Sequence, residues 1–181
     1  MKLFSEAYSG KKPEGAKKVT TYTFAPKGPV IKDSIGELPL HRGIYSGFKF
    51  NKDKVKNGVI SFTEFVYVGR AIKDNTLRKR VGEHYSQKDL KYRESGKTVD
   101  MSNVAFLYLD LDNLADDQIS DIEYAFISEY QPSANSDGIG HYAGKEAPLC
   151  ISVISFPGAD DLNLSRSFLI SEKDKEVDNE K

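Results

Sequence analysis

The chain has little of what secreted, zinc-binding and membrane proteins depend on. Its 181 residues include one cysteine, Cys150, and three histidines, so an internal disulfide is excluded and no Cys and His residues have zinc-ligand spacing. No apolar run approaches the roughly 20 residues that span a bilayer, and residues 1–12 lack the apolar core of a signal peptide. We therefore expect a soluble, cytoplasmic protein in a reducing compartment, with no membrane partner.

Charge of one sign is scarce in each half of the chain, although the formal net charge is only −1. Residues 1–97 carry 21 Lys and Arg against 10 Asp and Glu, whereas residues 98–181 carry 5 against 17. Neutralisation of phosphates by Lys and Arg supplies most non-specific affinity for DNA. The asymmetry therefore fits either a polyanion held on one side of the protein or two solvated faces of opposite charge.

Hydrophobic patterning predicts one α+β domain over residues 41–160, with the element order β-β-α-β-α. Aromatic and β-branched residues between turn signals predict strands, which cover residues 43–50, 62–69 and 104–109. Capping residues, acidic first turns and the proline at 132 delimit helices, which cover about 75–85 and 116–131. No internal repeat is evident.

Both ends of the chain are interpreted as extensions of this domain. Residues 1–40 are rich in Lys, Gly and Pro, and apart from a strand-like run at Val19–Phe24 they predict an irregular extension. The apolar run Leu149–Phe156 predicts an additional strand within the domain. Residues 161–181 are interpreted as a charged tail, and its end, 171–181, has too few apolar residues to fold, so we expect disorder there.

A carboxylate lies on the apolar face of the second predicted helix. Ile119, Glu123, Phe126 and Tyr130 follow the i, i+4, i+7, i+11 spacing of one helical face, so Glu123 points toward the core. Burying an unpartnered charge costs several kcal/mol, and such a group is usually paired, protonated or bound to a metal. Glu123 is therefore either half of a salt bridge or a functional carboxylate.

Arg80 and His84 are four residues apart along the edge of the first predicted helix, so both can face one cleft. An arginine there can neutralise a phosphate in bidentate fashion, and an imidazole can donate to phosphate or exchange a proton near neutral pH. Exposed Arg and His on a helix flank are also ordinary surface residues. The pair indicates a phosphate-binding site only if other residues of the chain support one.

Two tyrosines stand on the first two predicted strands. Tyr45 alternates with glycines on the thinner, more polar face of its strand, which predicts that it is accessible to a ligand. Tyr67 is expected to share a face with Phe65, so a core role explains it at least as well as a functional one.

Two short motifs in the middle of the chain contain these tyrosines. Gly43-Ile44-Tyr45 is followed, after a hairpin, by Tyr67-Val68-Gly69, and the two resemble the two signature tripeptides of the GIY-YIG nucleases. The family then has a basic residue, an arginine with a histidine four positions on, and a helical glutamate twelve residues before the asparagine of a Pro-x-x-Asn segment. These positions hold Arg70, Arg80, His84, Glu123 and Asn135. The shared order of five elements argues against coincidence.

The resemblance implies a metal-dependent endonuclease that hydrolyses phosphodiester bonds in double-stranded DNA, built on a three-stranded antiparallel sheet flanked by helices. It implies one Mg²⁺ or Mn²⁺ ion per active site, held by Glu123. Spacing to His84 favours Arg80 over Arg78 as the phosphate-binding arginine. The implied catalytic residues are Tyr45, Tyr67, Arg80, His84, Glu123 and Asn135. Of these, His84 and Asn135 would position phosphate or hold other side chains. The implied substrate-binding residues are Arg70, Lys79 and His141.

The resemblance leaves open which tyrosine, Tyr45 or Tyr67, activates the attacking water. A free phenol titrates near pH ~10, so this role requires a pKa lowered by cations such as Arg70, or proton transfer to a substrate phosphate.

The segment after Asn135 favours a restriction endonuclease within the family. Asp137-Gly-Ile-Gly-His141 resembles a Gly- and His-containing segment of restriction members. The alternatives are a repair, phage or mobile-element nuclease, and, in another class, a DNA-binding module whose nuclease site has decayed. One copy carries one catalytic glutamate, so cleavage of both strands would need a homodimer or successive nicks.

Overall fold

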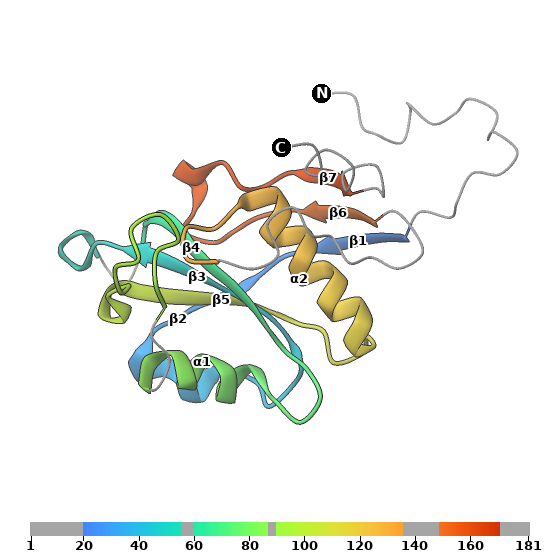
Figure 1. Ribbon diagram of the computed structural model, residues 1–181, viewed down its shortest axis with the longest axis horizontal. Coiled ribbons are helices and arrows are strands. Elements are labelled where there is room, and N and C mark those ends of the chain that lie inside the picture. Colours follow the sequence, from blue (N-terminus) through green and yellow to red (C-terminus); the bar gives the residue numbers. More distant parts are fainter. Residues whose placement is uncertain (1–19, 56–59, 87–89, 136–148, 171–181) are drawn as a thin grey trace, which may run out of the picture.

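The computed structural model describes residues 20–55, 60–86, 90–135 and 149–170, which form a mixed α+β fold (Figure 1). Within these ranges no helix is long and apolar enough to cross a membrane. The strands are β1 (Thr20–Phe24), β2 (Lys27–Val30), β3 (Gly43–Phe50), β4 (Phe62–Ala71), β5 (Val104–Asp110), β6 (Leu149–Val153) and β7 (Ser167–Ile170). The α-helices are α1 (Leu77–Ser86) and α2 (Asp116–Tyr130), and short 3-10 helices are η1 (Lys32–Glu37), η2 (Lys52–Lys54), η3 (Met101–Asn103) and η4 (Asp160–Leu162). The predicted β-β-α-β-α order is confirmed as β3-β4-α1-β5-α2.

The sheet that contains the motif strands has four strands, in the order β2-β5-β3-β4, and all its neighbours are antiparallel. The expectation of three strands is wrong because β2, inside the segment expected to be irregular, pairs with β5 through Lys27 and Val30. Gly28 and Pro29 give this stretch the pattern of a turn. An edge strand tolerates proline, however, since the missing N–H can be one that faces away from the ladder.

A second sheet has the order β1-β6-β7, with β1 parallel and β7 antiparallel to β6. The strand-like run at Val19–Phe24 is confirmed over Thr20–Phe24 as β1, and the additional strand predicted over Leu149–Phe156 is confirmed over Leu149–Val153. The expected charged tail contains β7, so order extends past residue 161 because the apolar run at 168–170 pairs with β6. The expected disorder at 171–181 lies outside the described residues.

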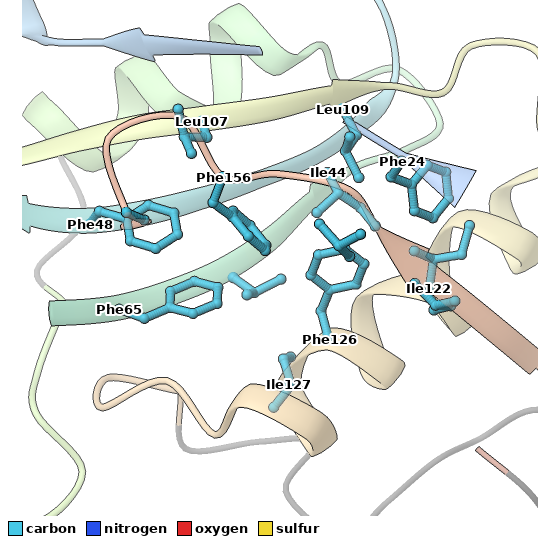
Figure 2. Packing of buried hydrophobic residues seen from close by; sticks show 14 of the residues in the cluster. Phe24, Ile44, Phe48, Phe65, Leu107, Leu109, Ile122, Phe126, Ile127 and Phe156 are labelled. Carbon is cyan, nitrogen blue, oxygen red and sulfur yellow. The ribbon is translucent and has the colours of Figure 1, made fainter. Parts of the chain in front are cut away.

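Two hydrophobic clusters lie on opposite faces of the four-stranded sheet. Neighbouring residues of a strand alternate between them, so Ile44 and Leu107 belong to the first cluster and Tyr45 and Phe106 to the second. The first cluster joins the sheet to α2, β1 and β6. Figure 2 shows Phe24 of β1 and Ile122, Phe126 and Ile127 of α2 gathered against the sheet. The second cluster packs against α1. The two α-helices therefore cover opposite faces of the sheet (Figure 1).

A β-bulge in β4 decides which face carries Tyr67. Gly47 pairs with Tyr67 but Phe48 pairs with Phe65, so Val66 is an extra residue on the β4 side. Such a bulge reverses the alternation beyond it. Phe65 accordingly packs in the first cluster, whereas Val66 and Tyr67 pack with the second. The expectation that Tyr67 shares a face with Phe65 is therefore wrong, and Tyr67 lies on the same side as Tyr45.

Candidate active site

A cavity of about 260 Å³ lies at the β4 edge of the four-stranded sheet. Side chains from both covered faces meet there, since α1 supplies one wall and α2 the other. The cavity gathers six of the nine site residues predicted from the sequence, which are Tyr45, Tyr67, Arg70, Arg80, Glu123 and Asn135. Three further residues, which sequence reasoning missed, complete the lining and are Tyr124, Ile127 and Ala134.

Glu123 and Arg70 form an ion pair on the cavity wall, from Arg70 Nη1 to Glu123 Oε2. Glu123 is only 8% exposed, and burial raises the pKa of its carboxyl group, against the lowering effect of the Arg70 and Arg80 charges. The salt-bridge interpretation of this carboxylate is thus correct as far as it goes. Both members of the pair also line the cavity, so the pair is not enclosed on all sides by the hydrophobic core.

Tyr124 holds the other side of the Arg70 guanidinium. The Arg70 Cζ atom lies 5.4 Å from the centroid of the Tyr124 ring, within the range of a cation–π interaction. Arg70 therefore lies between two consecutive residues of α2, the carboxylate of Glu123 and the ring of Tyr124. Helical spacing does not single out Tyr124, because it stands off the apolar stripe; its adjacency to Glu123 is the one signal in the sequence.

The structure separates the two candidate arginines of α1. Arg80 lines the cavity, and its Nη1 atom donates to Glu83 at 2.7 Å. Arg78 instead donates from Nε to the Leu38 carbonyl at 2.9 Å, and its backbone N–H bonds to the Pro39 carbonyl. Arg78 therefore fixes the segment after η1 against α1, and Arg80 is the arginine of α1 that lies at the cavity.

Tyr45 is 0% exposed, although the sequence predicts an accessible residue. A Cβ atom at Gly69 would lie 2.5 Å from both Cζ and Oη of Tyr45, so the space beside Gly69 is filled by the tyrosine ring and not by a ligand. Tyr45 Oη hydrogen-bonds with His84 Nε2 at 3.0 Å. Burial raises the pKa of Tyr45, an effect that the Arg80 charge opposes without overcoming. The lowered pKa required of a tyrosine base is therefore not found at Tyr45.

Tyr67 lines the cavity and is half-buried, as Tyr124 is. Its ring centroid lies 6.2 Å from that of Tyr45 and 5.0 Å from that of His84. His84 itself is buried, packs against Phe106, and is not part of the cavity wall. Of the two roles expected for His84, positioning phosphate or holding other side chains, its contacts with Tyr45 and Tyr67 favour the second. His84 positions those tyrosines.

Asn135 acts on the backbone of β4. It is 6% exposed; its Nδ2 donates to the Val68 carbonyl at 2.9 Å, and its Oδ1 accepts from the Val68 N–H at 2.8 Å. Backbone N–H groups of Ser133 and Ala134 donate to Phe65 and Val66. Residues 133–135 thus cover the open edge of β4, with an amide side chain in the place of a backbone unit. Asn135 thus lines the cavity while its side-chain amide is bonded to the Val68 backbone.

The remaining predicted residues lie elsewhere. Lys79 is exposed on α1 and does not line the cavity, because the helix turns its side chain away from β4. His141 and its glycine-rich segment lie outside the described residues.

No protein-family model, curated protein or solved structure matches this chain. In the described part of the chain, no group of three or more His, Cys, Asp or Glu residues could hold a metal ion by itself. Glu123 is the carboxylate that lines the cavity. The side chains that can carry chemistry here are one carboxylate, two arginines and three tyrosines, which meet at the edge of β4.

Proposed function

We propose that the protein is a metal-dependent DNA endonuclease of the GIY-YIG type that hydrolyses phosphodiester bonds in double-stranded DNA. The observation that carries the proposal is the convergence on one cavity of six motif residues that are spread over positions 45–135. Hydrolysis of a phosphodiester needs an oriented water, neutralisation of the phosphoryl oxygens and stabilisation of the leaving oxygen. A cavity with a carboxylate, two guanidinium groups and a phenol has side chains for each of these tasks.

The donor set fits a hydrated Mg²⁺ ion, because Mg²⁺ keeps several waters and is held by one or two carboxylates together with substrate phosphate. Glu123 would hold it. The Arg70 guanidinium pairs with this carboxylate, so an ion held by Glu123 would compete with Arg70 for it. When bound, the ion would polarise the phosphodiester and stabilise the leaving oxygen.

Each remaining side chain has a task that follows from where it lies. Arg80 and Arg70 are planar donors that bind non-bridging phosphate oxygens in bidentate fashion. Tyr67 holds the attacking water and passes its proton toward a phosphate oxygen. It is half-buried at the cavity, whereas Tyr45 is fully buried and the ring of Tyr124 is engaged with Arg70. Tyr45 and His84 support Tyr67 from behind.

The direct test is incubation of the purified protein with supercoiled plasmid, with Mg²⁺, with Mn²⁺ and with chelator, followed by resolution of the fragments. Cleavage only with a divalent ion supports the proposal, and discrete fragments support its restriction-type form. A smear of fragments indicates a relaxed nuclease instead. Binding of plasmid without cleavage under every condition would replace the proposal with a non-catalytic DNA-binding module.

Replacing Arg80 by alanine should reduce the cleavage rate by about 10²–10³-fold, which is the usual effect of removing one preorganised donor to developing charge. Arg78→Ala is the matched control on the same helix, and its rate should stay within a few-fold of wild type because Arg78 bonds to the Leu38 carbonyl away from the cavity. Single-turnover cleavage of a plasmid measures both variants. Equal losses would show that the arginine role is misassigned.

Tyr67→Phe should lose about 10²–10⁴-fold in rate, the range for a group that transfers a proton in the transition state. Tyr45→Phe should lose much less rate, because this hydroxyl group is buried against His84. It should instead cost about 1 kcal/mol of stability, since it removes the hydrogen bond to His84. Cleavage kinetics and thermal unfolding of both variants provide the comparison, and the reverse order of rate losses would transfer the water-activating role to Tyr45.

A further inference from the structure

A hairpin between α1 and β5, residues 90–99, is fixed against the α1 side of the sheet. We call it the basic hairpin. At its base the Val99 N–H donates to the Leu90 carbonyl at 2.7 Å, and both side chains are buried in the second hydrophobic cluster. Lys49 of β3 donates from Nζ to the Tyr92 hydroxyl at 3.3 Å. The base of the basic hairpin is therefore held by the hydrophobic core, while its turn, residues 93–98, is exposed to solvent.

The turn of the basic hairpin presents three cations. Lys91, Arg93 and Lys97 are exposed, and the turn carries one carboxylate, Glu94, which is also exposed. No ion pair joins any of the three cations to another residue in the described part of the chain. By contrast, Arg42, Arg70, Arg80 and Arg166 all pair with carboxylates. The basic hairpin therefore has positive charge that the described part of the protein does not neutralise.

The basic hairpin is bonded to the wall of the cavity. The Arg93 N–H donates to the Ser133 carbonyl at 2.8 Å, and Ser133 directly precedes Ala134 and Asn135, which line the cavity. The Ser133 N–H in turn donates to Phe65. Phe65 is two residues from Tyr67 along β4, a separation of about 7 Å at the rise of an extended strand. The cations thus lie beside the site and not on a remote surface.

We propose that the basic hairpin binds phosphates of the DNA duplex beside the scissile bond and so holds the duplex across the cavity. This inference rests on the proposed function and adds to it the surface that grips the substrate. Exposed Lys and Arg neutralise backbone phosphates without reading bases, so they fix the register of a duplex and supply salt-dependent affinity. The short hydrogen-bonded turn and its bond to Ser133 keep these cations at a fixed position relative to Tyr67 and Arg80.

The test compares two variants that each remove two positive charges. The hairpin variant is Arg93→Gln with Lys97→Gln. The control is Lys27→Gln with Lys32→Gln, two exposed residues of β2 and η1 at the sheet edge opposite to β4. Affinity for a fluorescein-labelled duplex is measured in chelator at several salt concentrations, and cleavage is measured in single turnover at saturating protein with Mg²⁺.

In the hairpin variant the slope of log affinity against log salt should fall by about 1–2, roughly one for each phosphate that the variant no longer neutralises. Its cleavage rate at saturation should fall by a smaller factor than its affinity, since Arg93 and Lys97 do not line the cavity. The control variant should keep the wild-type slope. Equal slopes for the two variants would overturn the inference and leave the nuclease proposal intact. An unchanged slope with a reduced rate would also overturn it, whereas a wild-type protein that neither binds nor cuts duplex DNA would overturn both proposals.

Discussion

A Glu123→Gln variant is expected to lose at least about 10³-fold in cleavage rate, equivalent to about 4 kcal/mol of transition-state stabilisation, while it binds duplex DNA as the wild-type protein does. Glutamine keeps the shape of the side chain and can accept from Arg70, but it lacks the negative charge that a divalent cation requires. Single-turnover cleavage with Mg²⁺ measures the rate, and fluorescence anisotropy in chelator measures binding.

A matched comparison separates loss of chemistry from loss of fold. Glu129→Gln removes a carboxylate from the same helix, where Glu129 pairs with Arg166 away from the cavity, and this variant should cut at the wild-type rate. Circular dichroism should show both variants folded. A Glu123→Gln protein that still cuts with Mg²⁺ would refute the role of this carboxylate, and an unfolded one would favour the purely structural salt bridge.

The burial of Glu123 also predicts how stability and cleavage depend on pH. Because burial raises the pKa of Glu123 in the folded, metal-free protein, the proton binds more tightly to the folded chain than to the unfolded one. The stabilisation from the protonated carboxyl is therefore present at low pH and is lost as pH rises through the raised pKa. Glu123→Gln, which stays neutral, should abolish this decline. Cleavage should show the opposite trend and fall as pH decreases through that pKa, since the ion needs the carboxylate form.

Asn135→Ala should be among the most destabilising single substitutions at the site, at about 2–6 kcal/mol, because it leaves both the N–H and the carbonyl of Val68 without their partners at a buried position. For a chain of this length the melting temperature should fall by about 5–20 °C. Differential scanning calorimetry or thermal circular dichroism measures the change.

Asn51→Ala is the matched control for this substitution. The Asn51 side chain also accepts from a backbone N–H, that of Asp53 at 2.9 Å, but the bond is exposed to water, so its loss should cost within about 1 kcal/mol. Similar losses for both variants would contradict the role of Asn135 as a substitute backbone unit. Asn135→Asp tests the donor half of this pairing separately. An aspartate keeps the hydrogen bond from the Val68 N–H but cannot donate to the Val68 carbonyl, so this variant should also be less stable than wild type.

The sequence predicts well what depends on local periodicity. Helical spacing places Glu123 on the buried side of α2, and turn signals bound β3 and β4, because these patterns repeat within one element. Prediction fails where the outcome depends on pairing between distant segments. The burial of Tyr45 depends on Gly69 lying opposite it, and the edge role of β2 depends on contact with β5. Neither strand pairing can be predicted from the residues next to Tyr45 or to β2, because the partner segment is distant along the chain.

The same limit applies to individual site residues. Spacing places His84 one helical turn after Arg80, but a helix edge gives no information about which neighbours fill the space in front of it. The resemblance leaves two roles open for Asn135, positioning phosphate or holding other side chains, and the motif does not predict its hydrogen bonds to the Val68 backbone. Tyr124 escapes prediction because its partner, Arg70, comes from a strand more than fifty residues away.

Because of the bulge at Val66, the length of the β3–β4 hairpin can change by one residue without changing the face of the sheet on which Tyr67 lies. β4 has ten residues against eight in β3, and the two register shifts between them absorb the difference. Deletion of Val66 would leave Phe65 and Tyr67 on the faces that they now occupy, since a regular alternation would resume. Deletion of Val68 would instead move residues on one side of the gap to the opposite face. The effect of a one-residue deletion in this hairpin therefore depends on its position. A deletion at the bulge leaves Tyr45 and Tyr67 on the same face of the sheet, whereas a deletion at a regularly paired position of β4 changes the face of the residues beyond it.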